Sequence, residues 1–236
     1  MQKIDTLGQA LIDYYNNEIK GDVIVNCSVA EPEIFPVEYF FREHKDLTKL
    51  EKKAIKLCKG KTLDIGAGTG CHTLILKDLG FDVNALDISQ EMIDLMKKRN
   101  INAIKSDIFE YNSDKYDTLL MLMNGLGMVK TISGLNKFLK YVKKNLLNKE
   151  GQIILNSTDL KYAFLEEDGS FCINLNEKYY GEIVYQIEYN NEKGSKFKWL
   201  YIDFDTLSYY ANINGFEAKK ILEEDEYSYL AVLKAV

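Results

Sequence analysis

Arginine is scarce in this sequence: of the 30 basic residues, only Arg42 and Arg99 are arginines, and the net charge is −6. Arginine provides the bidentate contacts to phosphates and base edges on which many nucleic-acid interfaces depend. An acidic chain also lacks the electrostatic attraction that holds a protein on a polyanion. We therefore expect no nucleic-acid partner.

Histidine and paired cysteines are also lacking. His44 and His72 are the only histidines, and none of the four cysteines belongs to a C-x-x-C pair. No zinc-ligand spacing can be built from these residues, so we expect no metal. A reduced, intracellular chain is the simplest interpretation of this cysteine usage.

Long apolar runs are missing as well. Residues 1–21 carry acids and amides where a signal peptide needs an apolar core. The longest nearly apolar run, residues 118–129, is too short and too interrupted by glycine to span a bilayer. We expect a cytoplasmic protein without a membrane partner. The sequence does not indicate its oligomeric state.

Strand-like and helix-like segments alternate from Lys61 to about Ser157. Apolar strand runs separated by amphipathic helices predict βαβ units, and hence a mostly parallel sheet with helices on both faces. Two further strand-like segments end the chain, and their short link requires one of them to run antiparallel. The prediction is an α/β fold with a seven-stranded, Rossmann-like sheet whose last strand is antiparallel.

Two segments lie outside this alternating core. Residues 1–56 contain helical spacing and are predicted to form a helical lid, with the proline-bracketed stretch 31–36 as an irregular link. Residues 57–236 form the core domain, with an insertion at about 160–203. Alternating aromatic residues on both sides of "NNEKGS" predict a β-hairpin in that insertion.

The stretch "LDIGAGTG" places Gly66, Gly68 and Gly70 at the carboxyl end of the first core strand. Glycines there allow a sharp turn and a ligand resting against bare backbone, and the following helix offers free N–H groups. Asp87 ends the next strand, where a carboxylate can accept hydrogen bonds from ribose hydroxyls. The pattern predicts a nucleoside-containing cofactor.

The glycine spacing is G-x-G-x-G, not the G-x-G-x-x-G of nicotinamide enzymes, which argues against a dehydrogenase. "LDIGAGTG", "FDVNALDIS", "IKSDIFE" and "YDTLLMLMNGLG" resemble the motifs of class I S-adenosylmethionine-dependent methyltransferases. The similarity covers about Leu57 to Ser157, and the two final strands match that fold as well. The resemblance implies S-adenosyl-L-methionine as the cofactor.

The resemblance also implies roles for individual residues. Gly66, Ala67, Gly68 and Gly70 would line the methionine part of the cofactor, with Asp64 near its amino group. Asp87 would bind the ribose, Ile88 and Ile108 would pack beside the adenine, and Asp107 would accept from its amino group. Asn124 and Gly125 would lie under the sulfonium. The alternatives are core packing for the two isoleucines and a loop cap for Asn124.

The resemblance also narrows the acceptor. The Pro-Pro-aromatic turn of amide and base N-methyltransferases is replaced by "NGLG", and the Pro-Cys nucleophile of cytosine C5 enzymes is absent. A small-molecule acceptor methylated at O, N or C remains the leading hypothesis. RNA or protein methylation and a non-catalytic S-adenosylmethionine-binding module remain alternatives.

The aromatic stretch "VEYFFREH" is the best candidate for a lid over the methyl group. An aromatic face favours a sulfonium charge, so Tyr39 or Phe41 is expected to face it, and Arg42 to bind a carboxylate of cofactor or acceptor. The alternative is core packing of the rings and a surface ion pair of Arg42. Further acceptor contacts are expected from the insertion, at Tyr179, Tyr180 and Trp199.

Methyl transfer from a sulfonium chiefly requires orientation of the reactants and exclusion of water. A general base helps where the acceptor must lose a proton. The sequence offers four candidates without choosing among them: His72, His44, Asp159 and Tyr179.

Overall fold

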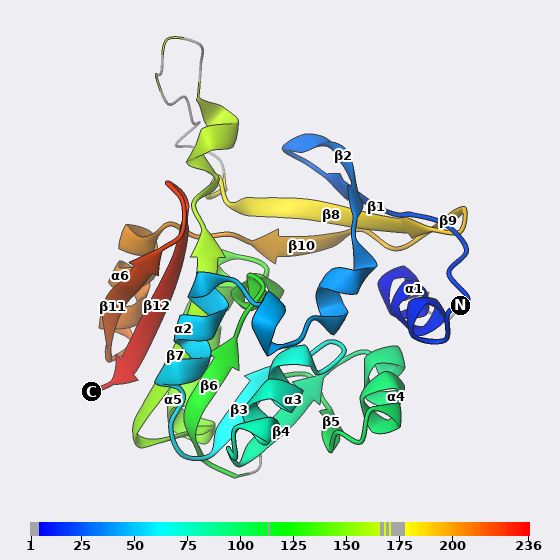
Figure 1. Ribbon diagram of the computed structural model, residues 1–236. Coiled ribbons are helices and arrows are strands. Elements are labelled where there is room, and N and C mark those ends of the chain that lie inside the picture. Colours follow the sequence, from blue (N-terminus) through cyan, green and yellow to red (C-terminus); the bar gives the residue numbers. More distant parts are fainter. Residues whose placement is uncertain (1–4, 113, 166–167, 169, 171–177) are drawn as a thin grey trace.

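A seven-stranded sheet forms the centre of the molecule (Figure 1). The computed structural model describes residues 5–112, 114–165, 168, 170 and 178–236. The strand order is β11-β12-β7-β6-β3-β4-β5. In chain order these strands are β3 (Thr62–Ile65), β4 (Val83–Asp87), β5 (Ala103–Lys105), β6 (Tyr116–Met121), β7 (Leu147–Thr158), β11 (Phe216–Glu223) and β12 (Ser228–Ala235).

The directions of these strands confirm the predicted sheet. Each neighbouring pair from β7 across to β5 is parallel. The final strand, β12, lies between β7 and β11 and is antiparallel to both. The carboxyl ends of the parallel strands therefore meet along one edge of the sheet, and the glycine turn at residues 66–70 follows β3 at that edge.

Helices cover both faces of the sheet because its central strands are apolar on both sides. Leu119 of β6 packs in a cluster with α5 and α6, and Leu120 packs in the opposite cluster with α2 and α3. The helices are α1 (Thr6–Tyr15), α2 (Lys49–Leu57), α3 (Cys71–Asp78), α4 (Gln90–Lys98), α5 (Ile132–Asn145) and α6 (Phe204–Ile213). None of the helices within the described residues has the length and apolar character needed to cross a membrane.

A second sheet joins the two segments outside the core. Its strands are β1 (Val23–Cys27), β2 (Ala30–Phe35), β8 (Glu182–Tyr189), β9 (Glu192–Lys193) and β10 (Phe197–Leu200). They are all antiparallel, in the order β10-β8-β1-β2, with β9 beside β8. The hairpin predicted in the insertion is confirmed, and it pairs with a hairpin from the N-terminal segment.

The N-terminal segment is therefore only partly helical, and the prediction of an irregular link at residues 31–36 was wrong. Most of that stretch belongs to β2, with Pro32 inside the strand. Proline is tolerated here because β2 is an edge strand and the pairing with β1 is irregular between Val25 and Cys27. Hydrogen bonding of these residues to β1 outweighs the preference of the two prolines for a loop.

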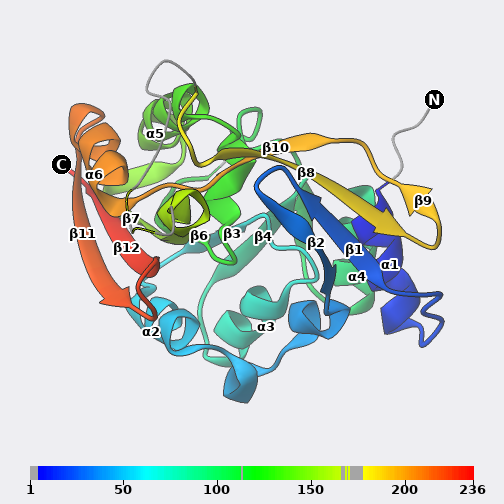
Figure 2. The same ribbon diagram turned by 90° about the horizontal axis from the view of Figure 1, so that it is seen from above.

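We call this second sheet the roof sheet, because it lies across the carboxyl ends of the central strands (Figures 1 and 2). It is fixed to the core through the 3-10 helix η3 (Gly125–Val129), which follows β6. A Cβ on Gly127 would overlap the indole of Trp199 in β10. The backbone N–H of Ile132 also donates to Glu182 Oε1 of β8 at 2.9 Å.

This contact can be tested because Trp199 is the only tryptophan. We expect Gly127→Ala to displace the indole and to lower the free energy of unfolding by about 1–3 kcal/mol, the range for overpacking. Intrinsic fluorescence should shift to the red as Trp199 meets water. Gly125→Ala on the same helix is the control, since the nearest atom to its new Cβ is 3.6 Å away. Unchanged emission from Gly127→Ala would contradict this packing.

Candidate cofactor site

The glycine turn depends on backbone conformations that favour glycine. Gly66, Gly68 and Gly70 have φ angles of 69°, 57° and 79°, in the left-handed region. The amides of Gly66 and Ala67 donate to the carbonyl of Leu86 at 2.8 and 3.1 Å. The turn is thereby fixed to the end of β4, and its bare backbone lies at the carboxyl edge of the sheet.

Asp87 ends β4 beside this turn. Its Oδ2 accepts from the N–H of Gly68 at 2.9 Å and its Oδ1 from the N–H of Ser89 at 2.9 Å. The residue is only 9% exposed, and burial raises its pKa despite those bonds. Each carboxylate oxygen can accept more than one hydrogen bond, so ribose hydroxyls can still be bound.

Asp64 lies beneath the turn. It is 2% exposed and accepts a 2.6 Å hydrogen bond from the hydroxyl of Thr73 in the first turn of α3. Burial raises the pKa of Asp64, with hydrogen bonds from Thr73 and the charge of His72 acting in the opposite direction. In this position the carboxylate ties β3 to α3.

The predicted adenine contacts fall into two groups. Ile88 is 65% exposed, although it is a large apolar residue next to Asp87. Ile108, in contrast, is buried in the core cluster with Leu86. Asp107 accepts from the N–H of Phe109 at 2.9 Å. Ile88 is therefore the isoleucine whose side chain is open to a ligand.

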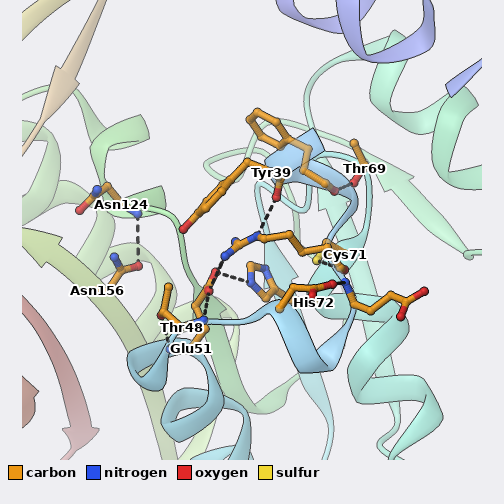
Figure 3. Close-up of polar contacts among 12 residues, drawn as sticks. Tyr39, Thr48, Glu51, Thr69, Cys71, His72, Asn124 and Asn156 are labelled. Atoms are coloured by element: carbon orange, nitrogen blue, oxygen red, sulfur yellow. Dashed lines mark hydrogen bonds and ion pairs between the residues drawn. The ribbon is translucent and has the colours of Figure 1, made fainter. Parts of the chain in front are cut away.

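Asn124 follows β6 on the other side of the glycine turn. Its backbone is left-handed, with φ 54°, and its N–H donates to Asn156 Oδ1 at 3.2 Å (Figure 3). Its own Oδ1 accepts from the hydroxyl of Thr158 at 3.4 Å. These bonds to β7 fix the Asn124–Gly125 peptide at the carboxyl edge of the sheet.

A cleft of about 330 Å³ opens at the same edge. Thr158, which bonds to Asn124, forms part of its wall. The other lining residues are Tyr162, Asp225, Tyr227 and Ser228. None of the predicted cofactor-binding residues lines this cleft, and its link to them is the bond between Thr158 and Asn124.

The predicted lid lies directly on the glycine turn. We define the lid segment as residues 37–42, which comprise the 3-10 helix η1 (Val37–Phe41) and Arg42. The carbonyl of Phe40 accepts a hydrogen bond from the Thr69 hydroxyl, and the carbonyl of Arg42 accepts from Cys71 Sγ at 2.9 Å. A Cβ on Gly68 would lie 3.6 Å from the ring of Phe40. The lid backbone is thus bound to the turn itself.

The aromatic residues of the lid point in different directions. Phe41 stacks on Tyr14 of α1, with ring centroids 5.1 Å apart. The ring of Tyr39 extends from the lid toward the side on which Asn124 lies (Figure 3). Of the two rings predicted to face the sulfonium, Phe41 packs on α1, and Tyr39 extends toward Asn124.

The Arg42 guanidinium is held inside the protein. Its Nη1 and Nη2 donate to the two carboxylate oxygens of Glu51 at 2.8 and 2.6 Å, and its Cζ lies 3.4 Å from the ring centroid of Tyr39. His72 Nε2 lies 3.0 Å from Glu51 Oε1 (Figure 3). Burial would raise the pKa of Glu51, but the hydrogen bonds from His72, Arg42 and the Thr48 N–H lower it to about 2.

The four candidate bases lie in three places. His72 is buried against Glu51, and His44 is exposed in the 3-10 helix His44–Asp46. Asp159 accepts from the Tyr180 hydroxyl at 2.7 Å, and Tyr179 donates to Asp203 at 2.6 Å. Asp159 and Tyr179 thus belong to one cluster, because Tyr180 also lies within 3.5 Å of Asp203.

Sequence reasoning missed Glu51, Asp203 and Arg99. The signal for Glu51 was the capping box of α2, in which Thr48 and Glu51 exchange side-chain to backbone hydrogen bonds. The signal for Asp203 was its position as N-cap of α6. Both patterns indicate a helix start and carry no information on the contacts made across the fold.

The buried Glu51 carboxylate predicts a dependence of stability on pH. Because its folded pKa of about 2 lies below its ordinary value of 4.5, its contribution is complete above pH 4.5 and is lost as pH falls toward 2. The shift is worth up to about 3 kcal/mol. Urea unfolding over this range should show a steeper acid loss in wild type than in Glu51→Gln. Equal acid losses would contradict the prediction. Glu217→Gln, at an exposed position of β11, is the control and should behave like wild type.

Comparison with known protein families adds independent information. The family model described as "Methyltransferase domain" matches residues 58–225. A SAM-dependent methyltransferase from Bacteroides fragilis, crystallised with S-adenosyl-L-homocysteine, is 39% identical to this chain, with a TM-score of 0.91. The alignment covers 100% of this chain and 98% of that one.

More distant structures share the fold. The CcbJ methyltransferase from Streptomyces caelestis is 15% identical, with a TM-score of 0.67 and 98% coverage of both chains. The PH0226 protein from Pyrococcus horikoshii is 22% identical, with a TM-score of 0.59 and coverage of 79% of this chain and 88% of that one.

A UPF0146 protein of Pyrococcus abyssi is 41% identical over 61 residues. That match spans 25% of this chain and 45% of the relative, so the chain covers less than half of that curated relative's length.

Proposed function

The chain belongs to the S-adenosylmethionine-dependent methyltransferases, and on that premise we propose that it methylates a small-molecule acceptor at O, N or C. One observation carries this proposal. The two segments outside the core combine into the roof sheet across the carboxyl edge, where the glycine turn and Asn124 also lie. A covered site of this kind suits a small acceptor better than a polymer.

The residues at the glycine turn fit this cofactor. Bare backbone at Gly66, Gly68 and Gly70 would bind its methionine part, and Asp87 would accept from the ribose hydroxyls. Ile88 would cover the adenine, and the exposure of this large apolar side chain supports that role. Asp107 would accept from the adenine amino group, and Asn124 and Gly125 would lie under the sulfonium.

When bound, the cofactor supplies an activated methyl group, so the protein must chiefly orient the acceptor and exclude water. The lid segment would exclude water above the glycine turn, and the ring of Tyr39 would face the positive charge. Burial raises the pKa of the Tyr39 hydroxyl, so this ring remains a neutral phenol beside the sulfonium.

For an acceptor that must lose a proton, we favour the cluster of Asp159, Tyr179, Tyr180 and Asp203 as the acceptor side. It follows β7, next to the Asn124 loop, and contains two of the four candidate bases. His72 is less suited because its Nε2 is bound to Glu51. His44 is exposed in the segment between the lid and α2.

The proposal is tested in two steps. Isothermal calorimetry with S-adenosylmethionine, S-adenosylhomocysteine and NAD should show micromolar binding of the first two alone. Release of S-adenosylhomocysteine is then measured with panels of small amines, phenols and carbon acids, and with bulk RNA and protein. Turnover only with RNA or protein would overturn the small-molecule assignment. Binding without turnover on any panel would favour a non-catalytic module.

The ribose assignment makes a specific prediction. We expect Asp87→Ala to weaken S-adenosylhomocysteine binding by about 1–3 kcal/mol, because ribose hydroxyls lose their acceptor. Asp117→Ala is the matched control, since this carboxylate is bonded to Lys61 and Asn148 at the opposite end of the strands. Calorimetry should show wild-type affinity for the control. Wild-type affinity for Asp87→Ala would remove Asp87 from the site.

A further inference from the structure

The two arginines of the sequence both lie at the contact between the lid segment and the glycine turn. Arg42 belongs to the lid segment and bonds to Glu51 of α2, which also contacts His72 of α3. Arg99 follows α4, and its Nη1 donates to the Thr69 carbonyl at 2.6 Å and to the Thr69 hydroxyl at 3.0 Å. All the other basic residues counted in the sequence are lysines, so both guanidinium groups lie at this one contact.

The contact around Glu51 is fully satisfied. Its Oε1 accepts from Arg42 and His72, and its Oε2 accepts from Arg42 and from the Thr48 N–H at 2.9 Å. The side chains of Arg42, Glu51 and His72 are 9%, 5% and 7% exposed, so water does not compete for these bonds. Truncating one member would leave buried charge unpaired, which is costly.

Arg99 contacts the lid through Thr69 and through Phe41. Arg99 donates to Thr69, and the hydroxyl of Thr69 in turn donates a hydrogen bond to the carbonyl of Phe40. The Arg99 Cζ also lies 5.4 Å from the ring centroid of Phe41. Thr69 is 1% exposed, so the chain of contacts from Arg99 through Thr69 to the lid is buried at its centre.

We propose that Arg42 and Arg99 are positioning residues that hold the lid segment closed over the glycine turn and thereby set how long the cofactor stays bound. This inference rests on the proposed function. Neither guanidinium needs to touch the cofactor, because the lid backbone at Phe40 and Arg42 is bonded directly to Thr69 and Cys71. Arg42 fixes the lid segment to Glu51, and Arg99 fixes Thr69, to which the lid carbonyl is bonded.

Lysine cannot replace either group, although it keeps the charge. An ammonium cannot donate to both oxygens of Glu51 in the planar geometry that Arg42 uses while stacked on Tyr39. At position 99 both bonds to Thr69 come from one nitrogen, Nη1, and the lysine side chain is one bond shorter, so its nitrogen falls short of that position; it also loses the planar group that contacts Phe41. Arg→Lys variants therefore separate the geometry of the two arginine contacts from their charge.

The test measures dissociation of S-adenosylhomocysteine by stopped flow from wild type, Arg42→Lys and Arg99→Lys, at a temperature where circular dichroism shows each to be folded. We expect dissociation about ten-fold faster in either variant, and a Kd for S-adenosylhomocysteine raised by a similar factor. Amide exchange of residues 66–73 without ligand should also accelerate. If Arg42→Lys does not fold, Arg99→Lys decides, since Arg99 is not part of the Glu51 network.

Asp117→Asn is the matched control. Asp117 is a half-buried carboxylate at the opposite end of the strands, where it accepts from the N–H of Lys61 and from the side chain of Asn148. The folded control should release the ligand at the wild-type rate even if its melting temperature falls. A purely structural role would make the arginine variants behave in the same way.

Wild-type dissociation and exchange rates in both folded arginine variants would overturn this inference while leaving the proposed function intact. A wild-type protein that does not bind S-adenosylhomocysteine would instead overturn the proposed function, and the inference with it.

Discussion

The pairing of β1 with β8 is the constraint on which the rest of the site depends. It joins a hairpin from the first 35 residues to a hairpin from the insertion after β7 and makes one antiparallel sheet of them. Without it, β1 and β2 would remain a two-stranded hairpin, which is at best marginally stable in water. The lid segment follows β2 directly, so the same pairing brings the lid over the glycine turn.

The site combines a rigid floor with a cover assembled from distant segments. The floor is set by the parallel strands, with left-handed glycines after β3 and the buried carboxylates Asp64 and Asp87 bonded to neighbouring backbone and side chains. The cover is held by a few side-chain contacts, chiefly Trp199 on Gly127 and Arg42 on Glu51. In the proposed function, cofactor recognition belongs to the floor and control of access belongs to the cover.

The sequence alone predicted the floor well, because its signals are local. Glycine spacing, strand ends and helix caps such as Ser89 are read within a few residues, and the observed strand directions agree with the prediction made from them. The cover was predicted only in outline. From the sequence Glu51 is only a helix-capping residue, and its bonds to Arg42 and His72 are visible only in the folded structure. β2 was missed because its proline is acceptable only on an edge strand, a fact of topology.

The long separation between β1 and β8 has a consequence for how the chain folds. Asn26 bonds to Glu188, 162 positions further along the chain. Such non-local pairing is slow to form, because the chain loses the entropy of loop closure before the stabilising contact is made. During synthesis the first hairpin must wait until almost the whole core has left the ribosome. The floor of the site can therefore assemble before its cover, and exposed edges of β1 and β8 would meanwhile be open to mispairing.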